Sequence, residues 1–189
     1  MEYWDKRYQI GGTSGYGSVG PIRDKKWSII NQFLPIVNHI IDVGCGDLSF
    51  WEGKDCNDYT GIDLSPTVIE QNRKARPKWV FKCQNASERI EGLSNCYVFC
   101  LDLLYHIMND NEYLAIIENL CSYSKLFLFV YTLIENPYGE RKTDGIYQKY
   151  RDFNLDLKTF EKNGFKLISV QKCQPWAAMH VFFNRGVNK

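Results

Sequence analysis

Two stretches decide the fold: IIDVGCG (residues 40–46) and, further along the chain, YTGID (residues 59–63). Each is a short apolar run that ends close to a carboxylate, which is typical of a buried strand in an α/β sheet. In such a sheet, ligands bind at the carboxyl ends of the strands, near the point where the strand order reverses. Glycines there let the backbone approach a ligand closely. The candidate ligand-binding residues are therefore Asp42, Gly44, Gly46 and Asp63.

Outward from these strands, strand-like and helical segments alternate along the chain. The strands predicted from apolar runs are 39–44, 59–63, 79–83, 96–101, 125–131, 165–172 and 176–184. The helices predicted from apolar periodicity are one around Trp4 and Tyr8, then 24–34, 66–75, 109–123 and 156–164. The last two strands must be antiparallel, because the few residues between them are too few for a parallel crossover. We therefore expect an α/β fold in which alternating units build a doubly wound, mostly parallel sheet of seven strands with an antiparallel C-terminal hairpin.

The chain of 189 residues is expected to form one domain. Residues 1–35 contain two helical segments and the glycine-rich stretch GGTSGYGSVG (11–20). We expect residues 1–35 to cap a Rossmann-like core formed by residues 36–184. The glycine-rich stretch is a candidate lid over a ligand, because its backbone N–H groups can bind an anionic group. The alternative is that it is a flexible connector.

Composition and charge narrow the classes of function. Lys and Arg total 23 against 22 Asp and Glu, so the net charge of +1 gives no overall field for binding nucleic acid. Local groups of positive residues lie at 22–27 and 141–151. The longest apolar stretch, 126–134, is shorter than the ~20 residues of a membrane span, and the polar N-terminus is unlike a signal peptide. We expect a cytoplasmic protein with no membrane contact.

The seven cysteines contain no CxxC pair, which argues against a zinc ribbon or a thioredoxin-type site. Several lie inside apolar runs such as CYVFCL (96–101). We expect the cysteines to be reduced and buried, and we predict no metal site.

The strand-end residues also indicate the kind of cofactor. A carboxylate at position 63 can accept hydrogen bonds from two ribose hydroxyls, which indicates a nucleoside-containing molecule. A dinucleotide site would have a third glycine where Ser49 stands, and no P-loop sequence GxxxxGK[ST] occurs. The Asp42 carboxylate would repel a pyrophosphate but attract the ammonium and sulfonium groups of S-adenosylmethionine (SAM). SAM is the cofactor that we expect, and a nicotinamide dinucleotide is the weakest alternative.

The motifs themselves resemble a known family. IIDVGCGDLSF (40–50) resembles motif I of the class I SAM-dependent methyltransferases, and YTGIDLSPTVIEQN (59–72) resembles the acidic motif that follows it. The resemblance covers about 36–184 and includes the antiparallel last two strands. The chain departs from the family at Leu48, where motif I usually has a third glycine.

The resemblance implies roles for individual residues. Gly44 and Gly46 would line the methionine part of SAM, Asp63 would hold its ribose, and Asn85 would lie near its adenine. The remaining cofactor contacts that we expect are Asp42, Leu64, Ala86 and Leu101.

The segment LDLLYHIMNDNEYL (101–114) resembles a subset of small methyltransferases that carry DxxYH after the fourth strand. Asp102 and His106 are therefore the candidate catalytic residues. His106 would act as a general base or would form a hydrogen bond with the substrate. The alternative is a histidine that belongs to the core.

Missing motifs narrow the methyl acceptor. The chain has neither the [DN]PP[YF] sequence of exocyclic-amine DNA methylases nor the Pro-Cys dipeptide of 5-methylcytosine enzymes. Tyr131 and Thr132 stand where ribose 2′-O-methyltransferases with a Lys-Asp-Lys-Glu tetrad have a lysine. The leading hypothesis is methyl transfer to an O or N atom of a small-molecule or sugar-type acceptor. The alternatives are an RNA methyltransferase, which the local positive residues favour, and a non-catalytic SAM-binding subunit of a partner enzyme.

Overall fold

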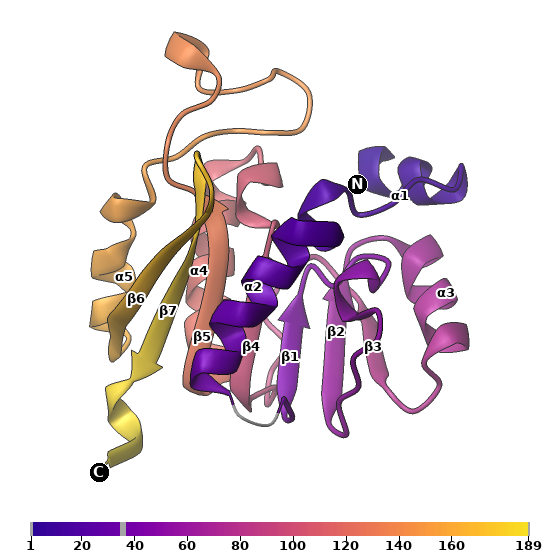
Figure 1. Cartoon of the computed structure of the whole chain (residues 1–189), viewed down its shortest axis with the longest axis horizontal. Coiled ribbons are helices and arrows are strands. Elements are labelled where there is room, and N and C mark those ends of the chain that lie inside the picture. The colour runs from indigo at the N-terminus through magenta and orange to yellow at the C-terminus, as the bar shows by residue number, and fades with distance from the viewer. Residues whose placement is uncertain (1, 35–36, 189) are drawn as a thin grey trace.

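The computed structural model describes residues 2–34 and 37–188. They contain a seven-stranded sheet with the strand order β3-β2-β1-β4-β5-β7-β6 (Figure 1). The strands are β1 (Ile40–Val43), β2 (Tyr59–Asp63), β3 (Val80–Cys83), β4 (Asn95–Leu101), β5 (Ser124–Leu133), β6 (Phe165–Gln174) and β7 (Ala177–Asn184). The α-helices are α1 (Glu2–Gln9), α2 (Gly20–Phe33), α3 (Pro66–Ala75), α4 (Asp110–Tyr123) and α5 (Leu157–Lys162). The expected boundary at residues 35 and 36 lies outside the described residues.

The pairing confirms the fold class predicted from the sequence. Strands β1 to β5 are parallel to one another, whereas β7 is antiparallel to both β5 and β6. The strand order reverses between β1 and β4, which are adjacent in the sheet. The carboxyl ends of the parallel strands therefore share one edge, and α1 lies beside that edge (Figure 1).

Helices cover both faces of the sheet, which makes it doubly wound. On one face, α2 buries Trp27 and Ile30 in a cluster with Phe99 and Phe129 of the central strands, and α3 adds apolar residues to the same cluster. On the other face, α4 and α5 bury a second cluster that includes Leu120. In Figure 1, α2 crosses in front of the sheet. The apolar stripe expected over 24–34 is thus a packing surface.

Polar residues set the starts of the helices that follow the site strands. The Ser65 hydroxyl accepts a hydrogen bond from the backbone N–H of Val68, and Pro66 occupies the first turn of α3. At α4, the Asn109 side chain accepts hydrogen bonds from the N–H groups of Asn111 and Glu112. These caps fix the loops that follow β2 and β4 at the carboxyl edge.

The alternation of strands and helices is less regular than the sequence predicted. Between β1 and β2 there is only a short 3₁₀ turn (Ser49–Trp51), and among the described residues none between β3 and β4 is helical. Glycines with positive φ at positions 44, 46 and 53 interrupt the first connection. In place of a helix, the fully buried Trp51 of this connection packs against the sheet.

The cysteines are all free, and four of them are buried as expected. Cys83 is exposed, and Cys96 and Cys173 are half-buried, so the expectation that all cysteines are buried is wrong for these three.

Within residues 2–34 and 37–188, no helix has the length and apolar character to cross a membrane.

Candidate active site

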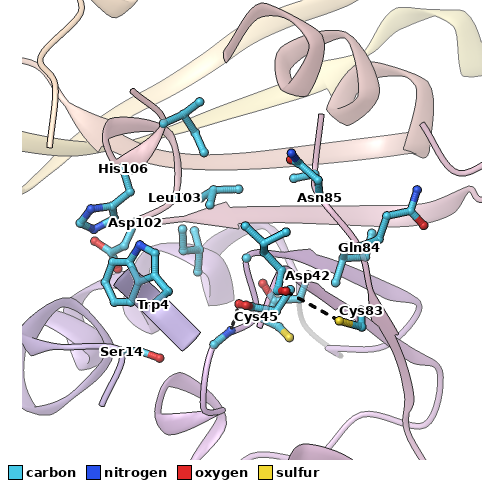
Figure 2. A pocket seen from close by; sticks show the side chains of 18 of the residues that line it. Trp4, Ser14, Asp42, Cys45, Cys83, Gln84, Asn85, Asp102, Leu103 and His106 are labelled. Carbon is cyan, nitrogen blue, oxygen red and sulfur yellow. Dashed lines mark hydrogen bonds between the residues drawn. The ribbon is translucent and has the colours of Figure 1, made fainter. Parts of the chain in front are cut away.

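A cavity of about 970 Å³ opens at the carboxyl edge of the sheet, at the upper end of the ~300–1,000 Å³ range of small-molecule sites. The structure brings every predicted site residue to its wall, and none lies elsewhere. The predicted residues that line it are Asp42, Gly44, Gly46, Asp63, Leu64, Asn85, Ala86, Leu101, Asp102 and His106. In Figure 2, Trp4, Asp102 and His106 lie at one end of the cavity, and Cys83, Gln84 and Asn85 lie at the other.

Asp63 is held firmly at the end of β2. Its Oδ2 accepts a hydrogen bond from the N–H of Gly46 at 3.0 Å, and its Oδ1 accepts one from the N–H of Ser65 at 3.0 Å. Burial raises the pKa of the Asp63 carboxyl, against the effect of these backbone donors. Each carboxylate oxygen keeps capacity to accept a further hydrogen bond from a ligand.

Asp42 is buried beneath the glycine turn that follows β1. Its Oδ2 accepts hydrogen bonds from Trp51 Nε1 at 2.7 Å and from the Tyr59 hydroxyl at 2.9 Å. Burial raises the pKa of Asp42 to about 6 in spite of these donors. The sequence predicted Asp42 as a site residue but gave no sign of the two aromatic donors that orient it.

The glycine turn adopts the left-handed backbone that its sequence suggests. Gly44 and Gly46 have φ values of +80° and +55°. A Cβ atom on Gly46 would lie 2.2 Å from Ser14 Oγ, so only glycine fits there. Leu48, at the position of the missing third glycine, also has a positive φ of 61°. The loop therefore keeps a glycine-like conformation at that position despite the side chain.

The glycine-rich stretch 11–20 packs against the same turn. The Ser14 N–H and hydroxyl donate to the Asp47 carboxylate at 3.0 and 2.8 Å, and the Asp47 N–H donates back to Ser14 Oγ at 3.0 Å. Ser14 and Ser18 line the cavity. The sequence indicated a lid but not the reciprocal pair with Asp47 that fastens it.

Asp102 follows β4 and forms an ion pair that the sequence did not predict. Its Oδ2 accepts a hydrogen bond from Lys26 Nζ, and its Oδ1 accepts one from the Tyr105 hydroxyl at 2.7 Å. Lys26 Nζ also donates to the Gly17 carbonyl at 2.9 Å and lies 3.7 Å from the centre of the Tyr131 ring. Burial lowers the pKa of Lys26, although Asp102 opposes that shift.

Lys26 was grouped with the positive residues at 22–27, but its side chain has no exposed surface. The signal that could have identified it is its spacing. Lys26 lies four residues before Ile30, which places it on the buried stripe of α2.

His106 lines the cavity and has a defined tautomer. Its Nδ1 lies 3.0 Å from the carbonyl oxygen of Tyr147, which only accepts, so Nδ1 carries the proton and Nε2 carries a lone pair. The Trp4 ring meets the imidazole edge to face, with centroids 4.7 Å apart, and the Tyr147 ring stacks on it at 5.5 Å. Burial lowers the pKa of His106 to about 4, so the ring is neutral at pH 7.

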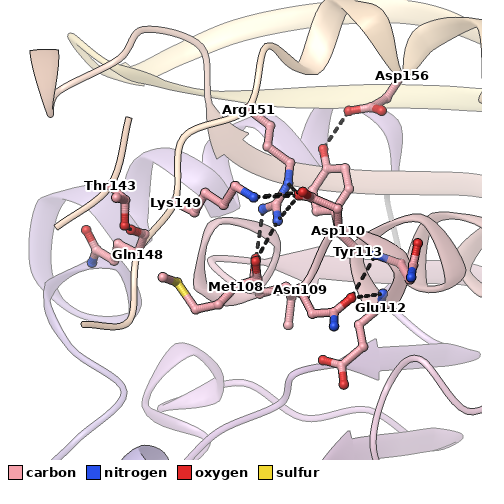
Figure 3. Close-up of polar contacts among 12 residues, drawn as sticks. Met108, Asn109, Asp110, Glu112, Tyr113, Thr143, Gln148, Lys149, Arg151 and Asp156 are labelled. Atoms are coloured by element: carbon pink, nitrogen blue, oxygen red, sulfur yellow. Dashed lines mark hydrogen bonds and ion pairs between the residues drawn. The ribbon is translucent and has the colours of Figure 1, made fainter. Parts of the chain in front are cut away.

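The positive residues of 141–151 are partly neutralised. Lys149 Nζ and Arg151 Nη2 both lie 2.7 Å from Asp110 Oδ1, at the start of α4 (Figure 3). Arg151 also donates to the carbonyl oxygens of Ile107 and Met108. These contacts tie the long segment after β5 to the loop that carries His106.

In the part of the chain that the structure describes, no cluster of three or more His, Cys, Asp or Glu side chains could hold a metal ion.

No protein-family model matches the sequence, and no curated protein matches it either. Several solved structures are similar in fold. Magnesium protoporphyrin IX methyltransferase (ChlM) from Synechocystis PCC 6803 with bound S-adenosylhomocysteine (SAH) has a TM-score of 0.67, with 97% of this chain and 96% of that chain covered at 17% identity. The DhpI–SAH complex has a TM-score of 0.69, with 95% and 92% covered at 16% identity.

The N-methyltransferase NodS from Bradyrhizobium japonicum WM9 in complex with SAH has a TM-score of 0.66, with 95% of this chain and 92% of that chain covered at 13% identity. At these identities the similarity concerns the fold. Strand order, the antiparallel β6–β7 hairpin and these solved structures agree. The chain therefore has the fold of the class I SAM-dependent methyltransferases.

Proposed function

We propose that the protein is a SAM-dependent methyltransferase that transfers a methyl group to an O or N atom of a small-molecule acceptor. One observation carries the proposal. The residues expected to bind SAM, which come from the ends of four different strands, surround a single cavity in a chain with the class I methyltransferase fold. The similar ChlM and NodS structures are methyltransferases with bound SAH, which supports the same ligand here.

The wall of the cavity fits SAM group by group. Asp63, oriented by two backbone donors, would accept hydrogen bonds from the ribose hydroxyls. Gly44 and Gly46 would leave room for the methionine part, with the Asp42 carboxylate close to its positive groups. Asn85, at the other end of the cavity, would lie beside the adenine.

Bound SAM would supply a methyl group activated on a positively charged sulfur. Positioning of the acceptor in line with that group, away from water, can supply much of the rate. His106 would accept a hydrogen bond from the acceptor through Nε2, and Asp102 would act as a positioning residue because Lys26 and Tyr105 engage its oxygens. A neutral imidazole with a lowered pKa is a weak base, so we assign His106 first to orientation.

The charge distribution favours a small molecule over RNA. Lys26 is buried, and Lys149 and Arg151 are paired with Asp110, so these members of the local positive groups are not free to bind phosphates. A protein that grips several phosphates needs free Lys or Arg side chains for each. ChlM, a magnesium protoporphyrin IX methyltransferase with a similar fold, acts on a small molecule.

Replacement of Asp63 by alanine is expected to weaken SAH binding by about 1.5–3 kcal/mol, the range of hydrogen bonds to a charged group. Titration calorimetry with SAH measures the loss, and circular dichroism checks that the variant is folded. Glu70→Gln, on the exposed surface of α3, is the control and should bind SAH as the unmodified protein does. Unchanged affinity in a folded Asp63→Ala protein would remove the ribose assignment.

SAM binding is also expected to depend on pH through Asp42. The raised pKa of about 6 means that the carboxyl becomes protonated as the pH falls through 6, which removes its attraction for the sulfonium. SAM affinity should fall as the pH drops below that point and stay constant above pH 7. SAH, which lacks the sulfonium charge, should show a weaker dependence. Calorimetry of both ligands at pH 5 and pH 7.5 measures the difference, and Asp42→Asn should abolish it; parallel pH profiles for SAM and SAH would contradict the placement.

A further inference from the structure

We propose that the acceptor end of the cavity takes an uncharged group that presents a hydrogen-bond donor, an O–H or a neutral N–H, and excludes carboxylates and phosphates. The acceptor end is the part of the wall formed by Trp4, Asp102, Leu103 and His106 (Figure 2). The inference rests on the proposed methyltransferase function and narrows its substrate class. Three features carry it: the absence of cationic side chains from the described cavity wall, the pairing of Lys26, Lys149 and Arg151, and the orientation of His106.

The described wall of the cavity carries negative but no positive side chains. It contains five carboxylates and neither lysine nor arginine; the carboxylates are Asp42, Asp63, Glu88, Asp102 and Glu112. Proteins bind a carboxylate or phosphate mainly through Arg or Lys, because a buried anion needs a charged or strongly polar donor. An anionic acceptor would find no cationic side chain in this described wall to compensate its charge.

The cation paired with Asp102 at the acceptor end, Lys26, is not available to a ligand. Lys26 has no exposed surface, and its Nζ is shared between Asp102 and the Gly17 carbonyl above the Tyr131 ring. A move toward an anionic ligand would leave the Asp102 carboxylate without its counter-ion in a poorly solvated site.

Two cations of the segment after β5, Lys149 and Arg151, are also held. Asp110 binds Lys149 and Arg151, and Arg151 makes further hydrogen bonds to backbone carbonyls of the same loop (Figure 3). They therefore brace the loop that carries His106 and do not serve as a receptor for an anion.

His106 adds a requirement for a donor. Because its Nδ1–H is committed to the Tyr147 carbonyl, Nε2 offers a lone pair, and none of the hydrogen bonds among the described residues engages Nε2. An acceptor O–H or neutral N–H would satisfy that nitrogen. A carboxylate or phosphate oxygen would bring lone pairs against a lone pair. Trp4 and Leu103 complete the wall with apolar surface, which suits the uncharged body of such a molecule.

Matched probes test the inference on the full chain loaded with saturating SAH. Dissociation constants are measured by ligand-observed NMR for benzyl alcohol against benzoate and phenyl phosphate, and for methyl glucoside against glucuronate and glucose 6-phosphate. We expect the hydroxyl probe of at least one series to bind about tenfold or more tightly than both of its anions, the size of one lost hydrogen bond or one unfavourable contact to a charged group. Anions that bind as tightly as their hydroxyl counterparts in both series would overturn the inference.

Two variants assign the preference to the site. His106→Gln replaces the fixed lone pair by an amide that can donate, so the preference for the hydroxyl probe should shrink several-fold while SAH affinity is unchanged. His39→Gln makes the same substitution at an exposed position before β1 that does not line the cavity, and it should keep the full preference. An unchanged preference in His106→Gln would overturn the role of His106. Failure of SAH to bind the unmodified protein would overturn the proposed function itself, whereas SAH binding together with tight anion binding overturns this inference alone.

Discussion

Replacement of Asp102 by asparagine is expected to lower the free energy of unfolding by about 3–5 kcal/mol, the usual cost of removing one partner from a buried ion pair. Asparagine keeps the size of the side chain and tolerates the positive φ of 62° at this position, so the change isolates the charge. Lys26, with no exposed surface, would be left with the Gly17 carbonyl as its remaining oxygen partner. Loss of the Lys26 proton would limit the cost, because burial already lowers its pKa.

Urea unfolding at pH 7 measures the loss. Glu70→Gln is the matched control, because it neutralises one partner of an exposed i,i+4 pair with Lys74 and should cost less than about 0.5 kcal/mol. The double variant Lys26→Met with Asp102→Asn removes both charges and should recover part of the stability. If Asp102→Asn costs no more than Glu70→Gln, the buried ion pair is not a structural element of the protein.

Replacement of Gly44 by valine is expected to abolish measurable SAH binding, a loss of about 100-fold or more, since it obstructs the cavity wall and crowds the turn that would hold the methionine part. Gly44 has a φ of +80°, and a Cβ atom there would lie 3.1 Å from the side chain of Leu103. A β-branched residue adds methyl groups beyond that contact and must also adopt a left-handed backbone, at about 1–2 kcal/mol.

Gly53→Val separates occlusion from backbone strain. Gly53 has a similar φ of +71°, but a Cβ atom there would meet no atom within 4 Å, and the residue does not line the cavity. It should lose a comparable amount of stability and keep its SAH affinity. Calorimetry with SAH compares the two variants, and normal binding by a folded Gly44→Val protein would contradict the assignment of the glycine turn to the cofactor.

The strand ends of this protein could be predicted from sequence because their signals are local. Short apolar runs ended by Asp42 or Asp63 mark buried parallel strands, and topology then places their carboxyl ends at one edge. The residues predicted from the first four strands consequently meet in one cavity. Short connections were similarly informative, since the brief link between β6 and β7 required an antiparallel pair.

The contacts that fasten the site were not predictable in this way. Lys26 stands next to Lys25 and Asp24 and looks solvated, and its burial depends on Asp102, which lies far along the chain. The partner of His106 is a backbone carbonyl, that of Tyr147, which carries no side-chain signature. Ser14 and Asp47, which lie 33 residues apart in the sequence, form another such pair. The pairs of Lys26 and Ser14 follow from the packing of the N-terminal segment on the sheet, and the pair of His106 follows from the packing of the segment after β5.

The measurement that tests the account most directly is a calorimetric titration of the unmodified protein with SAH, beside a titration with NAD. The account predicts saturable binding of one SAH per chain in the cavity at the ends of β1 to β4, and no binding of NAD to a site whose Asp42 carboxylate would repel a pyrophosphate. Absence of SAH binding, or binding of NAD in its place, would contradict the central claim that this cavity is a SAM site.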